Sequence, residues 1–352
     1  MEQALHDFRE RILSAGTEGR GLRLRGSGSK DWYGQAVQGD VLDTRAYSGI
    51  VNYEPTELVI TVRCGTTIRE VEAVLAEHKQ VLAFEPPHFG EQATIGGMVA
   101  VGLSGPRRQH AGAVRDFMLG AVLMNGKGDV LHFGGQVMKN VAGYDVSRLL
   151  AGSLGTLGLI LEVSLKVLPA PFAETTLRFE MSEADALRTL NEWAGQPLPI
   201  SATAWHDDTL LLRLSGSEAG VKAAQQKLGG ELIEPADHFW QAMREHTHAF
   251  FNTDEPLWRL SLPTVAPPLD LPGLPLIEWG GAQRWLATSA DAAAVRAAAV
   301  QAGGHATLFK GGDKSAGVFQ PLQPALMRIH KQLKAEFDPA GIFNPGRMYS
   351  EF

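Results

Sequence analysis

Residues 93–108, ATIGGMVAVGLSGPRR, form a run with four glycines and few large side chains, and this run strongly limits what the chain can fold into. Glycine in a regular element costs about 0.5–1 kcal/mol relative to alanine, because it loses more conformational freedom on folding. Glycines clustered in an apolar run therefore indicate that something lies close to the main chain. The two arginines that end the run suit an anionic neighbour.

The size and charge of the chain narrow the function classes. It has 352 residues, of which 44% are hydrophobic and 20% charged, which is typical of a globular protein with two domains. The net charge of −7 gives no overall attraction to a polyanion, so we expect no nucleic-acid partner.

The cysteine and histidine content argues against a metal site. The single cysteine, Cys64, excludes an internal disulfide, a thiolate zinc site and a cysteine-ligated iron–sulfur cluster within this chain. His246 and His248 lie two residues apart on a predicted helix and so point to different faces, which makes a poor metal pair. We expect no metal.

The location of the protein is predicted from two segments. The N-terminal segment mixes charges from its second residue, unlike a secretory signal. The apolar stretch 149–161 is shorter than the roughly 20 residues that a membrane helix needs. We therefore expect a cytoplasmic protein that reaches a membrane only through a partner.

Hydrophobic periodicity predicts short strands with occasional helices in the first half, which favours an α+β fold over a regularly alternating α/β sheet. The predicted helices are 2–15 and 66–80, and the predicted strands are 22–26, 41–45, 57–63, 81–84 and a hairpin within 117–135.

The second half has a different pattern and predicts a separately packed α/β domain. Its predicted helices are 183–194, 218–228, 238–247 and 290–303, with strands at 209–216, 257–263 and 283–288. The tail, 326–349, is predicted to be a helix that stops at Asp338-Pro339 and continues into an ordered turn.

The loop RGSGSK, residues 25–30, is a candidate phosphate site. It lacks the third glycine of the dinucleotide fingerprint, and the chain has no P-loop motif. Its backbone N–H groups could still converge on a phosphate, with Arg25 and Lys30 adding positive charge. A solvated turn is the alternative for this loop taken alone.

Six segments, in order, resemble the flavoproteins of the vanillyl-alcohol oxidase type, also called the p-cresol methylhydroxylase (PCMH) type of FAD-binding domain. They are RGSGSK, CGTTIREVEAVLAEHKQVLAFEPP, ATIGGMVAVGLSGPRR, AGAVRDFMLGAVLMNGKGDVL, AGSLGTLGLILEVSLKV and FDPAGIFNPGRMY. The resemblance implies an α+β FAD-binding domain of two subdomains at 1–170. It also implies a second α/β cap domain at 171–325, for substrate or partner, and a C-terminal segment, 326–352, that packs back on the FAD domain.

The resemblance also implies the residues that bind FAD. These are Arg25, Gly26, Ser27, Gly28, Ser29, Lys30, Pro86, Thr94, Gly96, Gly97, Ser104, Gly105, Arg107, Gly112, Val114, Gly155 and Ile160. We expect non-covalent FAD, because the phosphate loop carries Ser29-Lys30 where covalent members carry a histidine. His88 and His110 are the remaining credible attachment points.

A narrower resemblance, to the smaller FAD-binding subunits of bacterial glycolate oxidases, rests on residues 85–100, 139–158 and 343–349. It implies oxidation of glycolate to glyoxylate by hydride transfer to flavin. It also implies electron transfer to partners, a larger FAD subunit and an iron–sulfur subunit, in a complex associated with the inner membrane. A stand-alone FAD-linked dehydrogenase for D-lactate or a similar acid, and a non-catalytic flavin-bearing subunit, remain alternatives.

Two departures from the wider family leave the catalytic residues unassigned. Many members have asparagine at the position of Gly102, and many carry a histidine-rich set where residues 303–322 hold the single His305. His305 could be a base over the flavin or a surface residue. Arg107 and Arg108 could hold a carboxylate or phosphates, or form a salt-bridged loop. Arg347, by its position, could approach the pyrimidine edge of the flavin.

Overall fold

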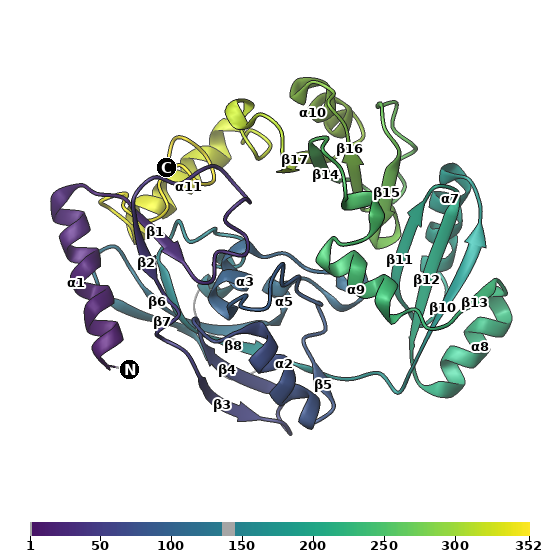
Figure 1. Ribbon diagram of the computed structural model, residues 1–352, viewed down its shortest axis with the longest axis horizontal. Helices are drawn as coiled ribbons and strands as arrows, with labels where there is room; N and C mark the ends of the chain where they lie inside the picture. The colour runs from purple at the N-terminus through teal and green to yellow at the C-terminus, as the bar shows by residue number, and fades with distance from the viewer. Residues whose placement is uncertain (1, 136–144) are drawn as a thin grey trace. The chain divides into compact units, whose positions relative to one another are not determined.

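A computed structural model describes residues 2–135 and 145–352, which form two compact units (Figure 1). Unit 1 comprises Met1–Leu103, Ala113–Pro169 and Pro321–Phe352, and unit 2 comprises Ser104–Gly112 and Ala170–Gln320. Residues 136–144, which include the first six residues of the motif 139–158, lie outside the described residues.

Unit 1 is built on a five-stranded antiparallel sheet with the strand order β3-β4-β8-β6-β7. Its strands are β3 (Ile50–Glu54), β4 (Val59–Arg63), β6 (Met118–Met124), β7 (Val130–Gly134) and β8 (Leu159–Lys166). The central strands β4 and β8 are largely buried, and Val62 pairs with Val163 in their ladder. Strands buried on both faces need mostly apolar sequences, as VITV and LILEVSL are.

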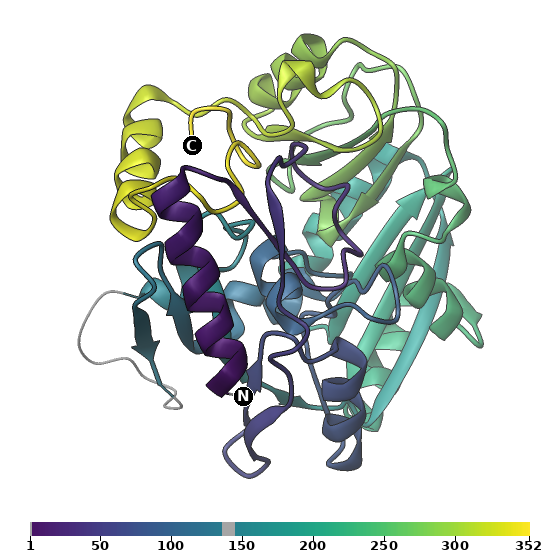
Figure 2. The ribbon, with the colours of Figure 1, turned by 60° about the vertical axis from the view of Figure 1, so that its left-hand side comes forward.

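Short helices surround this sheet. They are α1 (Glu2–Glu18), α2 (Ile68–Glu77), α3 (Ile95–Val101), α5 (Val114–Phe117), α6 (Val146–Leu149) and α11 (Pro324–Phe337). The side chain of Thr67 caps α2 by accepting the Glu70 N–H, which satisfies one free donor at the helix start. Helix α3 packs against β4 and β8. Figures 1 and 2 show α1 beside β2 and the β6–β7 hairpin, and Arg11 donates to the Val41 carbonyl there.

The C-terminal segment packs within unit 1 by pairing with the first strand. Strands β1 (Leu22–Arg25) and β2 (Asp40–Asp43) form a parallel pair. Leu22 N donates to the Ile342 carbonyl at 2.7 Å, and Asn344 N donates to the Leu22 carbonyl at 2.9 Å. Residues more than three hundred positions apart in the sequence therefore lie side by side.

Unit 2 contains an eight-stranded sheet with the order β13-β10-β12-β11-β15-β16-β14-β17. Its strands are β10 (Ala173–Glu180), β11 (Ile200–His206), β12 (Thr209–Gly216), β13 (Glu231–Ile233), β14 (Leu257–Ser261), β15 (Pro275–Glu278), β16 (Gln283–Ala287) and β17 (His305–Lys310). Its α-helices are α4 (Arg108–Ala111), α7 (Glu183–Ala194), α8 (Glu218–Leu228), α9 (Asp237–Glu245) and α10 (Ala292–Gln301). Apolar faces of α7 and α8 bury one cluster against the sheet, and α10 buries a second.

Several predicted elements differ from the structure. The strand predicted at 81–84 is reduced to the two-residue β5 (Gln80–Val81), which pairs with β9 (Leu168–Pro169), because the chain turns directly after Val81, with the Glu85 N–H donating to the Leu82 carbonyl at 2.9 Å. Residues 104–112, which the predicted boundary at 170 places in the first domain, group with unit 2. The assignment of separate functions to the predicted domains 1–170, 171–325 and 326–352 stays a prediction.

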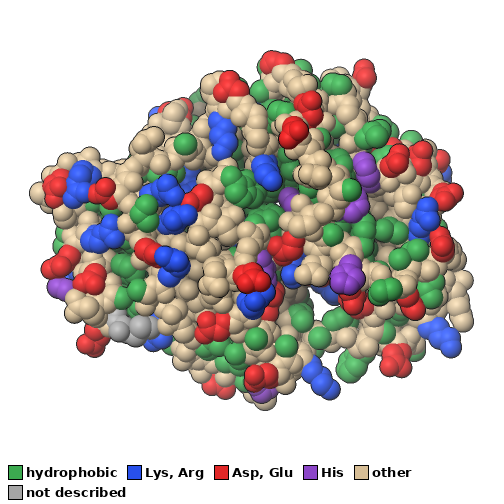
Figure 3. Space-filling view, viewed as in Figure 1, with side chains coloured by type: hydrophobic (Ala, Val, Ile, Leu, Met, Phe, Trp, Pro, Cys, Tyr) green, Lys and Arg blue, Asp and Glu red, His purple; other side chains and the backbone are tan. Residues whose placement is uncertain are grey.

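The described residues contain no helix that is both long and apolar enough to cross a membrane. On the face of the molecule in Figure 3, basic and acidic side chains are interspersed.

Candidate cofactor site

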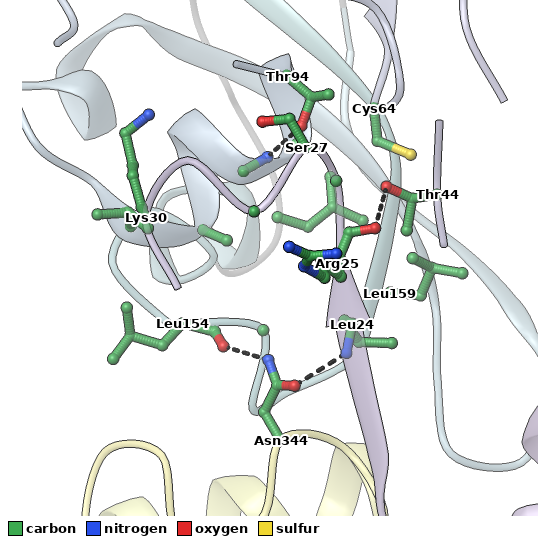
Figure 4. A pocket seen from close by; sticks show the side chains of 18 of the residues that line it. Leu24, Arg25, Ser27, Lys30, Thr44, Cys64, Thr94, Leu154, Leu159 and Asn344 are labelled. Carbon is green, nitrogen blue, oxygen red and sulfur yellow. Dashed lines mark hydrogen bonds between the residues drawn. The ribbon is translucent and has the colours of Figure 1, made fainter. Parts of the chain in front are cut away.

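A pocket with about 690 Å³ of empty space, open to solvent, lies in unit 1. Six parts of the chain form its wall: the loop after β1, the end of β2, the end of β4, helix α3, the loop into β8, and the C-terminal segment (Figure 4). The lining residues are Leu24, Arg25, Gly26, Ser27, Gly28, Ser29, Lys30, Asp31, Thr44, Cys64, Thr94, Gly96, Gly97, Ala100, Val101, Leu154, Gly155, Gly158, Leu159, Ile160, Asn344 and Arg347.

The loop after β1 presents free backbone donors at this wall. The N–H groups of Gly26, Ser27 and Gly28 have no hydrogen-bond acceptor among the described residues. The loop is held in place at both ends, since Thr44 N donates to the Arg25 carbonyl at 3.0 Å and Asp31 N donates to the Gly28 carbonyl at 3.1 Å. Successive free N–H groups in a fixed turn form an anion-binding concavity.

Helix α3 contributes shape rather than free donors. Ile95 N donates to the Thr66 carbonyl, Gly96 N to the Cys64 carbonyl, and Gly97 N to the Thr94 hydroxyl. A Cβ on Gly96 would lie 2.7 Å from the Cys64 Cβ, whereas within 4 Å a Cβ on Gly97 would meet one atom, the Thr94 Oγ1 at 3.2 Å. Gly96 therefore permits close packing of α3 on β4, and Gly97 keeps the wall of the pocket bare.

Charged side chains on the pocket wall are mostly cationic. Arg25, Lys30 and Arg347 line the pocket together with one carboxylate, Asp31. Asp31 accepts hydrogen bonds from Arg25 and Arg23, both at 2.7 Å. Lys30 is buried, and its Nζ donates to the His88 carbonyl at 2.9 Å. The arrangement favours an anionic ligand.

Cys64 also lines the pocket. Its thiol is unreactive for the following reason. Complete burial raises the pKa of Cys64 to about 12. Because the thiolate is the nucleophilic form, this thiol stays protonated and unreactive near neutral pH.

The C-terminal segment forms another part of the pocket wall. The Asn344 side chain donates to the Leu154 carbonyl at 2.6 Å and accepts the Leu24 N–H at 2.9 Å (Figure 4). A Cβ on Gly155 would meet the Asn344 Nδ2 at 2.7 Å. Asn344 thus joins β1 to the loop before β8 at the point where both face the pocket.

The predicted FAD-binding residues separate into two groups. Residues of the RGSGSK loop line the pocket, as do Thr94, Gly96, Gly97, Gly155 and Ile160. Pro86 and Val114 are buried in unit 1 outside the lining, and Ser104, Gly105, Arg107 and Gly112 belong to unit 2. The role of each in FAD binding stays a prediction. Sequence reasoning placed no ligand contact at Leu24, Asp31, Thr44, Leu154 or Asn344.

The paired arginines of the glycine-rich run already have partners within unit 2. Arg107 forms an ion pair with Glu174, and the Arg108 guanidinium lies over the Trp279 ring at 4.5 Å from its centroid. The Gly105 carbonyl accepts the Trp279 indole N–H at 3.1 Å. This geometry matches the salt-bridged loop that the sequence left as the alternative.

His246 and His248 do not share a helix, which corrects the prediction for 238–247. Helix α9 ends at Glu245, and His246 follows with a positive φ of 53°. Its ring stacks on Phe251 with 4.1 Å between centroids, and His248 contacts Phe239 and His206 edge to face. Both imidazoles therefore pack within an aromatic cluster.

Comparisons with known proteins identify the family of the chain. A model described as an FAD-binding domain matches residues 6–134, and one described as the C-terminal domain of FAD-linked oxidases matches residues 284–348. The chain is 52% identical over 342 residues to the glycolate oxidase subunit GlcE of Escherichia coli, covering 97% of this chain and 96% of that protein. The chain belongs to the GlcE family.

More distant relatives share part of this family's sequence. The glycolate oxidase subunit GlcD of Bacillus subtilis is 32% identical over 208 residues, which cover 57% of this chain and 44% of that protein. A solved structure of an alkyldihydroxyacetonephosphate synthase matches 96% of this chain and 74% of its own, with a TM-score of 0.65 and 16% identity, and so shows a shared fold. These matches confirm the predicted α+β fold, FAD as the cofactor, and an FAD-dependent oxidoreductase subunit.

Proposed function

We propose that this chain is the FAD-binding subunit of a glycolate-oxidising complex, and that the unit 1 pocket holds FAD without a covalent bond. The observation that carries the site is the run of free N–H groups at Gly26, Ser27 and Gly28 beside Arg25 and Lys30. These donors suit the diphosphate of a dinucleotide. The relative that supports the substrate is the glycolate oxidase subunit GlcE.

The residues of unit 1 fit the group that the family implies. The free donors of the loop would hold the diphosphate, the bare backbone at Gly97 would admit the planar part of the ligand, and Ile160 and Leu159 would supply apolar contacts. When bound, FAD supplies the redox chemistry by accepting a hydride from the 2-hydroxy acid. The chain itself supplies position and charge.

Partners are part of the proposal. With one cysteine, this chain cannot hold a cysteine-ligated iron–sulfur cluster, so electrons leave through other subunits. We expect a larger flavin subunit of the GlcD type and an iron–sulfur subunit, with unit 2 offering the cap or partner surface. Association with the inner membrane would go through that complex.

The test is to purify the chain alone and together with the neighbouring subunits. We expect about one FAD per chain, elution of the complex above 38.0 kDa, and anaerobic bleaching of the flavin by glycolate but not by acetate, which lacks the hydroxyl. A flavin-free chain, or one that elutes alone when co-expressed with the neighbouring subunits, would contradict the proposal.

A second candidate function keeps the flavin but moves substrate oxidation to the partner. It is favoured by the region 303–322, which carries one histidine where many relatives carry a set. Bleaching by glycolate in the complex, but not in the isolated FAD-loaded chain, would favour this candidate. D-lactate added in the same assay distinguishes a stand-alone D-lactate dehydrogenase.

A further inference from the structure

Arg347 is a buried guanidinium at the pocket wall with unused bonding capacity. The residue is 7% exposed and lines the pocket. One terminal nitrogen donates to the Lys30 carbonyl at 3.2 Å and the Tyr33 carbonyl at 3.3 Å. Its Nε is buried and has no hydrogen-bond partner among the described residues.

The charge of Arg347 is also uncompensated at short range. No carboxylate of the described chain lies within ion-pair distance of it, and the nearby Asp31 is engaged by Arg23 and Arg25. Burial lowers the pKa of Arg347, and the nearby Asp31 carboxylate opposes that shift. A buried charge is normally paired, so this site is incomplete without an anion.

The hydrogen bond to the Lys30 carbonyl shows which part of the pocket wall lies next to the Arg347 guanidinium. It holds the guanidinium at the end of the loop that carries the free N–H groups of Gly26, Ser27 and Gly28. Those donors and Arg347 line the same pocket. The sequence alone suggested the pyrimidine edge of the flavin for Arg347, and the loop contact argues for a phosphate instead.

We propose that Arg347 binds the diphosphate of the dinucleotide, acting from the C-terminal segment as the cationic partner of the Gly26–Gly28 loop. The inference rests on the proposed function, because it requires a dinucleotide in this pocket. It assigns to the C-terminal segment a direct part in cofactor binding, besides the packing that Asn344 provides.

The test measures the affinity of the flavin-stripped full chain for FAD, ADP and riboflavin in wild type, Arg347→Met and Arg347→Lys. We expect Arg347→Met to weaken FAD and ADP by a similar factor, about 10- to 100-fold, which is the range for one charge-assisted hydrogen bond. Riboflavin, which has no phosphate, should bind equally well to both. Arg347→Lys keeps the charge without the planar fork and should lose less.

The matched control is Arg296→Met in unit 2. Arg296 is also a buried arginine that donates to two backbone carbonyls, those of Ala316 and Gly317, and it does not line the pocket. The Arg296→Met substitution should lower the stability of the protein without changing its affinity for ADP. The dependence of ADP affinity on salt gives a readout that loss of packing would not move, since Arg347→Met should flatten it relative to wild type.

Three results would overturn the inference. Unchanged ADP affinity in a folded Arg347→Met protein would show that no phosphate contacts this side chain, and weakened riboflavin binding with unchanged ADP binding would place Arg347 at the flavin ring. A wild-type chain that binds neither FAD nor ADP would overturn the proposed function together with the inference.

Discussion

Replacing Lys334 with methionine should release the C-terminal segment from unit 1. Lys334 lies on α11, and its Nζ donates to Asp338 Oδ2 at 2.7 Å and to the carbonyls of Thr156 and Phe343, both at 2.8 Å. The Lys334 side chain is 7% exposed and that of Asp338 is 0% exposed. This ion pair therefore holds together α11, the loop before β8 and the segment that leads to Asn344 and Arg347.

The expected cost follows from what the substitution leaves behind. Removing one partner of a buried ion pair typically destabilises a protein by about 3–5 kcal/mol, because the other charge stays buried without compensation. Asp338 would still accept the N–H groups of Ile342 at 3.1 Å and Phe343 at 2.7 Å. We therefore expect the lower end of the range, about 3 kcal/mol.

Hydrogen–deuterium exchange measures this loss within one unit. A loss of about 3 kcal/mol in opening free energy corresponds to roughly 150-fold faster exchange when reclosing is faster than the chemical exchange step, so that exchange reports the opening equilibrium. Peptides covering 326–347 should show this acceleration, and peptides from β12 in unit 2 should not. Lys331→Met, at an exposed position of the same helix, is the control and should change exchange very little. Acceleration of less than about fivefold in Lys334→Met would refute the reasoning.

Three further outcomes are expected. Gly97→Val should purify without FAD, because its branched side chain would fill the bare wall of the pocket; normal flavin absorbance per chain would contradict this. Acid precipitation should release the yellow chromophore into the supernatant, and a yellow pellet would show covalent attachment. Burial lowers the pKa of His246 to about 3 from an ordinary value of 6.5, so below pH 6.5 the unfolded state binds a proton that the folded state excludes. This side chain should lower the free energy of unfolding by about 2 kcal/mol between pH 8 and pH 5, as measured by urea unfolding. If the wild type and His246→Phe show the same pH dependence, the prediction is wrong.

The elements that could be predicted from the sequence are those with a clear local signal. Helix α2 follows from its apolar spacing and its Thr67 cap, and the β6–β7 hairpin from the turn NGKGD between apolar runs. The central strand β8 gave a weaker signal, because it follows a glycine-rich stretch that was interpreted as a ligand contact. Its place in the sheet is set by pairing with β4 and β6, which are distant in sequence.

In the candidate site, too, some residues could be predicted from a local sequence signal, and others are placed by contacts between distant segments. The loop 25–30 and the segment 94–97 could be identified because glycines and hydroxyl residues gather in each of them. Asn344 and Arg347 sit in a short tail motif, and the geometry that brings them to the pocket depends on backbone pairing with Leu22 and on the Lys334–Asp338 ion pair. A local sequence pattern gives the residue type at each position, but it does not give the distant backbone carbonyl that a side chain contacts in the folded protein.

The glycines of the pocket answer two different physical demands, and this explains why they cluster. Cβ atoms on Gly26, Gly96 and Gly155 would meet Thr94, Cys64 and Asn344 at 2.2, 2.7 and 2.7 Å, so these glycines let separate segments of the protein approach one another. Gly97 is less crowded, since its Cβ would meet the Thr94 Oγ1 at 3.2 Å, and its backbone lines the pocket. Most of the bare backbone therefore brings the pocket walls together, and a smaller part of it is left to face a ligand. Substitutions at the crowded glycines should consequently damage the folding of unit 1 as well as cofactor binding, whereas Gly97 separates the two effects.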